Sequence, residues 1–132
     1  MTNFTRSITI SIQDTSGATI TVNYGTLTGG YFDPVPIPGT TIQPGTTVSY
    51  VNGANDNFTY PGGSILLTPA SGGSISVNWN WPSGSLANGS VTTQSVSGLG
   101  VSYQMVNTQT NSPTLQVVIS NASSFQAIPE NN

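Results

Sequence analysis

The chain of 132 residues contains no cysteine and no histidine, and only 4 % of its residues are charged. Ordinary domains carry about 25 % charged residues. The absence of cysteine excludes disulfides and thiol nucleophiles, and without histidine or lysine a serine nucleophile lacks its usual base. The few acids are scattered through the sequence: Asp14, Asp33, Asp56 and Glu130. We therefore expect a protein that is not an enzyme, uses no cofactor and holds no metal.

Positive charge is almost absent, because Arg6 is the only Lys or Arg in the chain. Proteins that bind nucleic acid neutralise phosphates with many basic side chains. Attraction to anionic membranes likewise needs clusters of Lys and Arg. The composition excludes both classes, and any membrane target is expected to be neutral or zwitterionic.

Long apolar runs are also missing. The N-terminal segment MTNFTRSITISIQD has no continuous apolar stretch and no cleavage site, so the sequence predicts a chain made without a signal peptide, cytoplasmic or released by a non-classical route. No stretch approaches the length of a transmembrane helix, and no amphipathic helical pattern that could insert by itself is visible.

What the chain does contain is alternation of apolar residues with Ser, Thr and Asn. Residues 5–12, 19–24, 46–51, 64–68, 75–81, 90–96, 101–107 and 114–120 have the two-residue period of strands, separated by turn signals rich in Gly, Pro and Asn. The sequence therefore predicts an all-β protein, a single-domain antiparallel β-sandwich over residues 1–132, with a frayed tail from about residue 121.

Local signals also predict how some strands connect. Residues 5–12 and 19–24 are expected to pair as a hairpin around a turn at residues 13–17, in which Asp14 caps the backbone. Asn52-Gly53 is expected to end a strand, and Asn88-Gly89 to form a hairpin turn. The Pro- and Gly-rich residues 25–44 predict an ordered edge or loop that carries apolar side chains.

The segment GSISVNWNWPSGS, residues 73–85, contains both tryptophans of the chain. In an extended strand Ile75, Val77, Trp79 and Trp81 share one face, and Pro82 ends the strand. We expect Trp79 to anchor the core and Trp81, at the strand end, to form the rim of a binding surface.

Aromatic side chains are the remaining candidates for binding, because rings with a polar edge suit both sugar stacking and the headgroup level of a membrane. Trp79 and Tyr103 lie on regularly alternating faces and are expected to be mainly structural. The candidate lipid- or membrane-binding residues are Tyr24, Tyr31, Phe32, Phe58, Tyr60, Trp79 and Trp81.

The order of several short motifs resembles the aegerolysin family across most of the chain. These motifs are G-x-L at Gly25 and Leu27, Gly29-Gly30 followed by Phe32, I-x-P-G at Ile42, Pro44 and Gly45, Gly62-Gly63, and W-N-x-P at Trp79, Asn80 and Pro82 followed by Gly84-Ser85. The chain departs from the family pattern at Tyr24, where many members have tryptophan, and at Ser83, where they often have an aromatic residue. Trp81 lies two positions before Ser83 and can compensate.

The resemblance implies a small acidic β-sandwich that recognises a membrane lipid, often a sphingolipid, at target cell membranes. It also implies a larger pore-forming protein as partner, as for the small component of binary insecticidal toxins. The function expected is the lipid-binding component of a two-protein cytolytic or insecticidal toxin. Two alternatives stay open from the residues alone: a carbohydrate-binding lectin domain, and a charge-poor structural β-domain.

Overall fold

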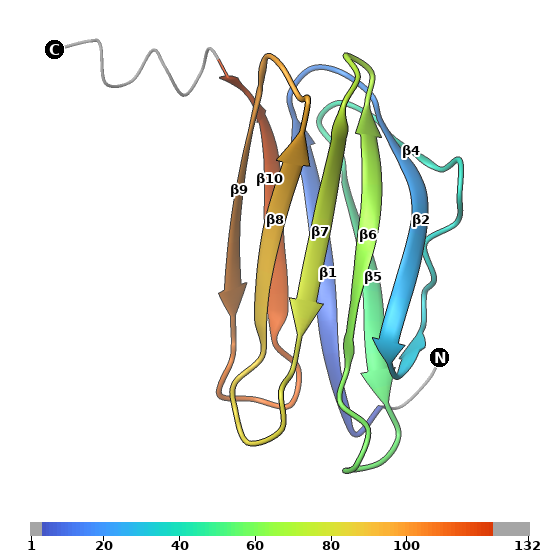
Figure 1. Cartoon of the computed structure of the whole chain (residues 1–132), viewed down its shortest axis with the longest axis vertical. Coiled ribbons are helices and arrows are strands. Elements are labelled where there is room, and N and C mark those ends of the chain that lie inside the picture. The colour runs from blue at the N-terminus through green and yellow to red at the C-terminus, as the bar shows by residue number, and fades with distance from the viewer. Residues whose placement is uncertain (1–3, 123–132) are drawn as a thin grey trace, which may run out of the picture.

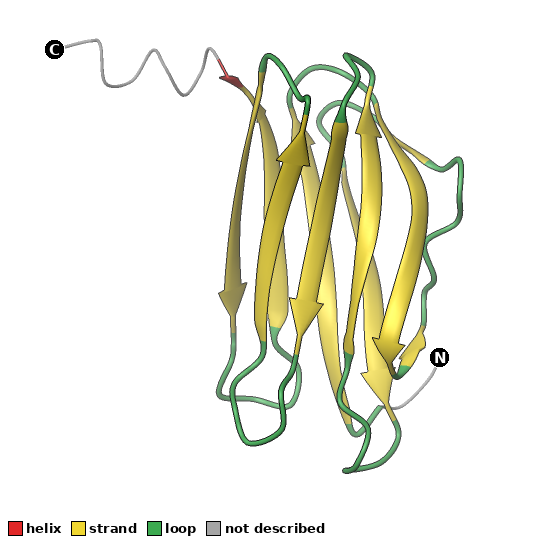
Figure 2. Ribbon diagram, in the orientation of Figure 1, coloured by secondary structure: helices red, strands yellow, loops and turns green. Residues whose placement is uncertain are grey.

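A computed structural model describes residues 4–122 and shows two stacked β-sheets (Figures 1 and 2). The strands are β1 (Arg6–Thr15), β2 (Ile20–Gly29), β3 (Tyr31–Phe32), β4 (Thr41–Ile42), β5 (Thr47–Ala54), β6 (Gly62–Pro69), β7 (Ser74–Asn80), β8 (Asn88–Gln94), β9 (Leu99–Val106) and β10 (Thr114–Asn121). In these residues no helix is long and apolar enough to cross a membrane. Most of the tail that we expected to fray lies outside the described residues.

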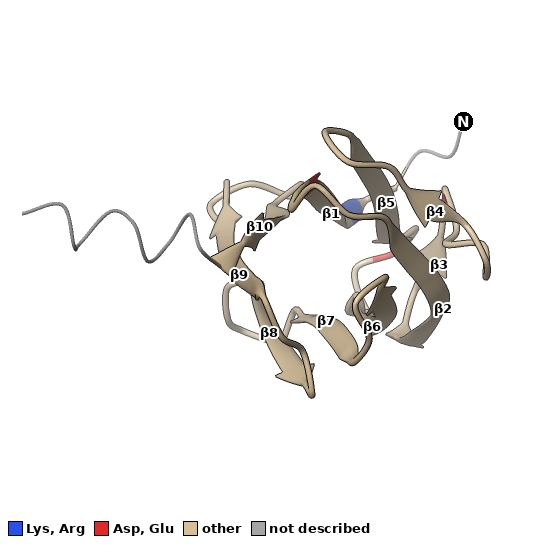
Figure 3. Ribbon diagram, turned by 90° about the horizontal axis from the view of Figure 1, so that it is seen from above, with Lys and Arg blue, Asp and Glu red and all other residues tan. Residues whose placement is uncertain are grey.

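The two sheets have five strands each, in the orders β3-β5-β1-β10-β9 and β4-β2-β6-β7-β8. Neighbouring strands are antiparallel, with one exception: β1 and β10 run parallel, with Ile10 opposite Leu115. Viewed along the strands, the sheets face each other across one interior, and very few charged positions interrupt them (Figure 3). The predicted all-β sandwich is thus confirmed.

The core lies between the sheets and follows from the alternation of the sequence, because every second side chain of a strand points to the same face. From β1, Ile8, Ile10 and Ile12 are fully buried, and from β7 Ile75 and Val77 are fully buried with Trp79 beside them. The other buried apolar residues include Ile20, Val22, Ile65, Leu67, Leu115, Val117 and Ile119.

The expected hairpin between the first two strands is wrong. The turn after β1 carries the chain into the opposite sheet, where β2 pairs with β4 and β6, while β1 pairs with β5 and β10. Alternation requires only that each strand turn its apolar face to the core. Two such strands meet this requirement equally well as neighbours in one sheet and as members of opposite sheets. Asp14 caps as predicted, since its Oδ1 accepts a 2.9 Å bond from the Ser16 amide, although it belongs to β1.

Two turn predictions are also corrected. Asn88-Gly89 lies inside β8, because Asn88 pairs with Asn80 and the β7–β8 connection comprises residues 81–87. Asn52-Gly53 lies inside β5, where Asn52 pairs with Ile8 and Phe32. Packing explains the glycine at position 89, because a Cβ there would lie 2.7 Å from the Leu115 side chain.

The Pro- and Gly-rich segment contains the end of β2, then β3 and β4, and is ordered as predicted. Val35 and Ile37 are exposed, whereas Pro36 between them is buried over Gly25. The Gly39 amide donates to the Val22 carbonyl at 2.8 Å. These contacts fasten the segment along the side of the sandwich.

Candidate functional site

Two loops lie at the same end of the sandwich (Figure 1): residues 55–61 between β5 and β6, and residues 81–87 between β7 and β8. Each of them carries an exposed apolar side chain. We call this end of the sandwich the aromatic end. Phe58 is 88 % exposed, and Leu86 on the other loop is 51 % exposed. The Phe58 ring is therefore available for contact with an apolar surface.

Arg6, the only Lys or Arg of the chain, joins the two loops. Its guanidinium carbon lies 4.6 Å from the centroid of the Tyr60 ring and 5.5 Å from that of Trp81. Its Nη2 donates a 2.9 Å hydrogen bond to the Asn57 carbonyl. Cation–π contacts of this kind contribute roughly 0.5–1 kcal/mol each at exposed sites. Arg6 thus ties the first strand to both loops.

The loop that carries Phe58 is shaped by Asp56. The carboxylate oxygen Oδ1 accepts hydrogen bonds from the backbone amides of Phe58 at 2.9 Å and Thr59 at 2.7 Å. These two backbone bonds are the main reason why the pKa of Asp56 lies below its usual value; the Thr59 hydroxyl and the charge of Arg6 lower it further. The turn is therefore preformed and holds the Phe58 ring outward.

Tyr60 connects the loops a second time. The Ser83 hydroxyl lies 3.3 Å from the Tyr60 hydroxyl, and this contact and Arg6 lower the pKa of the phenol. The Trp81 amide donates to the Pro61 carbonyl at 3.0 Å. Polar contacts therefore link the two loops of the aromatic end to each other.

Below the aromatic end, buried Asn52 links the two sheets. Its Oδ1 accepts a 2.9 Å bond from the indole Nε1 of Trp79, and its Nδ2 donates to the carbonyls of Gly29 at 3.0 Å and Tyr31 at 3.2 Å. Gly30, at φ +82°, has no room for a side chain beside Asn52 and Gly53. Asn52 thereby fixes the turn from which Tyr31 projects.

The structure brings only some of the sequence-predicted aromatic residues together. Phe58, Tyr60 and Trp81 belong to the aromatic end, with Tyr60 and Trp81 partly buried. Tyr31, 63 % exposed, lies near it on the flank, beside β5.

Two of the candidates lie inside. Trp79 is 3 % exposed, and Phe32 packs edge-on against it with 6.1 Å between ring centroids. Trp79 is buried as its alternation predicts, so these two rings support the site from below. The structural role expected for Tyr103 is wrong, because β9 is an edge strand and the side chain is 48 % exposed.

Tyr24 lies away from the aromatic end, on the outer face of β2. The sequence places it on the same face as Ile20 and Val22, but a β-bulge intervenes: Val22 faces Leu67 and Tyr24 faces Leu66, so that Asn23 is an extra residue. An extra residue reverses the alternation. Tyr24 is 53 % exposed as a result.

Sequence reasoning missed three residues of this region: Arg6, Leu86 and Asn52. The rarity of positive charge was the only signal that set Arg6 apart. Leu86 and Asn52 carried no local signal, since their positions depend on which loops and strands meet. In the described part of the chain no cluster of three acidic, His or Cys side chains is placed to hold a metal ion.

No protein-family model matches the sequence, and the curated proteins contain no match either. Solved structures do match. The lipid binding protein Nakanori has a TM-score of 0.75 at 12 % identity, covering 88 % of this chain and 71 % of Nakanori. RahU, solved in complex with a TRIS molecule, has a TM-score of 0.69 at 16 % identity, covering 90 % of this chain and 97 % of RahU. IP-1A from Alcaligenes faecalis has a TM-score of 0.59 at 16 % identity, covering 87 % of this chain and 91 % of IP-1A. At these identities the chain shares the fold of the three proteins.

Proposed function

We propose that this protein binds lipid membranes through its aromatic end and that it is a non-enzymatic, aegerolysin-like protein. The observation that carries the proposal is Phe58, 88 % exposed on a loop whose shape is set by the Asp56 hydrogen bonds. A preformed apolar tip loses little conformational entropy when it enters the headgroup region. The fold shared with a lipid binding protein supports the proposal.

The chemistry of the aromatic end suits an uncharged or zwitterionic surface. Tyr60 and Trp81 have rings with a polar edge, which are enriched at the membrane–water interface. Arg6 supplies a single positive charge between them, enough for one phosphate but not for attraction to an anionic membrane.

A larger role is proposed on the motif resemblance. In it the chain is the lipid-binding component of a two-protein cytolytic or insecticidal toxin, recognises a sphingolipid at the target cell membrane, and recruits a larger pore-forming protein. The test is dye release from sphingomyelin-containing vesicles with this chain, with a pore-forming protein encoded beside it, and with both. Release by the pair alone supports the role. Release that is the same without this chain contradicts it.

Phe58→Ala is expected to weaken binding to phosphatidylcholine–sphingomyelin vesicles about tenfold. The reason is that burying one phenylalanine ring is worth roughly 1.5–3 kcal/mol, of which a loop tip at an interface realises a part. Vesicle sedimentation over a series of lipid concentrations measures the effect. Tyr103→Ala, which removes a half-exposed ring from β9, is the matched control and should bind as the unmodified chain does.

Equal binding by the Phe58 and Tyr103 variants would exclude the aromatic end as the contact surface. Binding to a glycan array without binding to any vesicle would favour the lectin alternative. Reversible assembly into large particles, seen by light scattering, would favour the structural alternative.

Trp81→Ala is expected to weaken vesicle binding by a similar factor at a small cost in stability, about 1–2 kcal/mol. The ring is only partly buried and covers one side of Arg6. Urea unfolding and vesicle sedimentation on the same preparation separate the two effects. A stability loss larger than that of Trp79→Ala would show that Trp81 belongs to the core.

A further inference from the structure

We propose that a hollow on the outer face of one sheet binds an uncharged sugar through its hydroxyl groups. This outer hollow has a volume of about 330 Å³ and lies where β2, β6 and β7 run side by side (Figure 1). Its polar side chains are those of Thr26, Thr28, Ser64, Asn78 and Asn80. The site is separate from the aromatic end, and only a glycolipid source of the sugar rests on the proposed membrane function.

Strand alternation turns these side chains away from the core. In β2, Leu27 packs against the core, so Thr26 and Thr28 on either side of it point outward and are exposed. In β7, Trp79 is buried in the same way, and the asparagines on either side of it point outward. The polar lining of the hollow is therefore a direct consequence of the alternation that builds the core.

Gly62 allows two of these groups to converge. It lies in β6 opposite Asn80 of β7, and an added Cβ would lie 2.6 Å from the Oγ1 of Thr28 and 3.3 Å from the Oδ1 of Asn80. The two oxygen atoms thus approach the same point of β6 from the strands on either side of it. A side chain at position 62 would push them apart, so glycine here shapes one end of the hollow.

Most of the polar groups in the hollow are not engaged within the protein. Thr26, Ser64 and Asn78 form a row across the three strands. The Asn78 side chain is used, because its Oδ1 accepts from the Ser76 hydroxyl and its Nδ2 donates to the Ser76 carbonyl, both at 3.2 Å. The other four polar side chains of the hollow have no hydrogen-bond partner among the described residues. They are available to water or to a ligand.

The chemistry of the hollow suits a sugar. Hydroxyl and amide groups both donate and accept hydrogen bonds, and so do the hydroxyls of a sugar ring. In the part of the chain that the structure describes, no charged side chain lines the hollow, so a phosphate or an amine would lose hydration there without a countercharge. An apolar ligand would cover the hydroxyls without bonding to them. The volume lies at the lower end of the range for ligand pockets, which suits a single sugar ring.

The outer hollow adjoins the aromatic end along the chain. Asn80 directly precedes Trp81, and Gly62 directly follows Pro61, so both loops of the aromatic end start or finish at the hollow. A molecule that touches a membrane with its aromatic end would hold the hollow near the headgroups. The sugar can therefore come from a glycolipid headgroup or from a free glycan. Both offer the same hydroxyls, and the experiment must distinguish them.

The test is a backbone amide NMR titration with the methyl glycosides of glucose, galactose, mannose and N-acetylglucosamine. Glycerol at equal concentration is the reference for an open-chain polyol. We expect saturable shifts around Thr28, Ser64 and Asn80 with at least one glycoside, at a dissociation constant on the order of millimolar. The proposal is overturned if no glycoside produces saturable shifts.

Variants of the hollow identify the groups that bind. Thr28→Val replaces a hydroxyl by a methyl group, and Asn80→Ala removes an amide; each should weaken binding about fivefold, the loss expected for one hydrogen bond. Gly62→Ala keeps both groups but pushes them apart, and should weaken binding similarly, with its thermal melt and amide spectrum verifying the fold. Thr92→Val is the matched control, because Thr92 lies on the same outer face in β8 but outside the hollow. Normal binding by the Thr28 and Asn80 variants would overturn the proposal.

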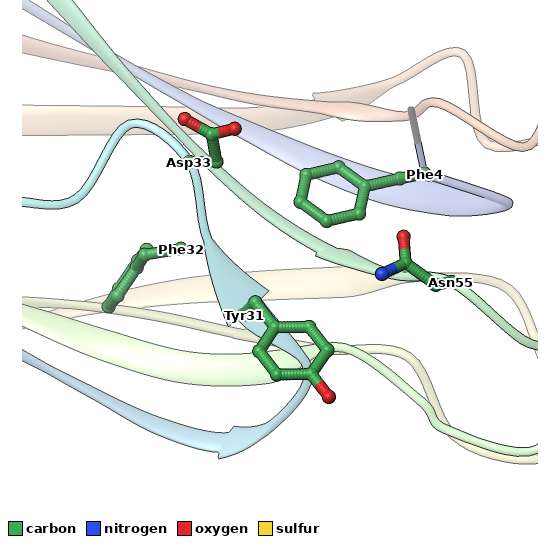
Figure 4. Close-up of a pocket in the computed structure, with 5 residues that line it drawn as sticks. All are labelled: Phe4, Tyr31, Phe32, Asp33 and Asn55. Carbon is green, nitrogen blue, oxygen red and sulfur yellow. The ribbon is translucent and has the colours of Figure 1, made fainter. Parts of the chain in front are cut away.

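The flank of the sandwich is the alternative place for a sugar, because it offers a ring to stack on. Figure 4 shows a second pocket there, lined by Phe4, Tyr31, Phe32, Asp33 and Asn55. Tyr31→Ala removes its exposed ring and should leave sugar binding unchanged. Loss of binding in this variant, with normal binding by Thr28→Val, would assign the sugar to the flank and overturn the outer hollow.

Vesicles then distinguish the sources. If the sugar belongs to a lipid, phosphatidylcholine vesicles that contain galactosylceramide or glucosylceramide should bind better than phosphatidylcholine alone, and the methyl glycoside that titrates should compete. If a glycoside titrates but no vesicle is bound, the proposed membrane function fails while the sugar site stands with a free glycan as its ligand. If vesicles bind equally with and without the glycolipid and no glycoside titrates, the membrane function stands and the sugar site fails.

Discussion

Replacing Trp79 with alanine should lower the free energy of unfolding by about 3–5 kcal/mol, one of the two largest effects that we expect from single substitutions in this protein. The indole is 3 % exposed and packs against Phe32 between the two sheets. Its removal leaves a cavity bounded by strands of both sheets, and it also leaves the Oδ1 of Asn52 without the indole N–H that it accepts at 2.9 Å.

Urea unfolding followed by far-ultraviolet circular dichroism measures this loss. Trp81→Ala is the internal comparison, because it deletes the same side chain two residues further on, where the ring is only partly buried. The expected order is a large loss for Trp79 and a small one for Trp81. The reverse order in the two unfolding curves would contradict the division between a supporting tryptophan and a surface tryptophan.

Asn52→Ala should cost nearly as much, about 3 kcal/mol, although asparagine is polar. The fully buried side chain satisfies three partners at once: the Trp79 indole and the carbonyls of Gly29 and Tyr31. Each buried polar group that loses its partner costs roughly 1–3 kcal/mol. Water entering the vacated space can restore part of this, so the expected total is below the sum.

Asn78→Ala is the matched control for Asn52→Ala, because Asn78 is only half-buried and its side-chain bonds are to Ser76 in the same strand. It should cost less than about 1 kcal/mol. A double-mutant cycle that combines Asn52→Ala with Trp79→Phe should give an interaction energy of about 1 kcal/mol or more. Strict additivity in this cycle would show that the hydrogen bond across the core contributes nothing.

The Asn52 bonds also join the core to the surface. Because Asn52 holds the carbonyls on both sides of Gly30, its loss should loosen the turn from which Tyr31 projects. The core beneath the aromatic end and the surface beside it are therefore parts of one hydrogen-bonded unit. The same polar residue that the sequence suggested as a strand end is instead the connection between the two sheets.

Sequence periodicity was enough to identify most of the core and every strand except the two short ones, β3 and β4, which lie in the segment predicted as an edge or loop. The alternation of Ile8, Ile10 and Ile12, and of Ile75, Val77 and Trp79, predicts which face of each strand is buried, and the structure buries all six. Alternation succeeds because it is a property of one extended strand and needs no knowledge of its neighbours. Composition was equally local information, and it predicts the charge-poor surface that both sheets present.

Pairing and exposure needed the tertiary structure. A strand's own pattern does not say whether its neighbour lies beside it or across the core, so the pairing of β1 with β5 and β10 was inaccessible. The bulge at Asn23 turns Tyr24 outward because the partner strand is one residue shorter at that point, and no signal within β2 records this.

By itself, then, the sequence determined an all-β, charge-poor protein with aromatic side chains as the groups available for binding. Only the tertiary structure decided which of these residues gather: Phe58, Tyr60 and Trp81 lie on loops at one end, with Arg6 against the rings of Tyr60 and Trp81. The physical reason is that burial along a strand depends on a two-residue period, whereas a site depends on contacts between loops far apart in the chain, which are set by strand order and register.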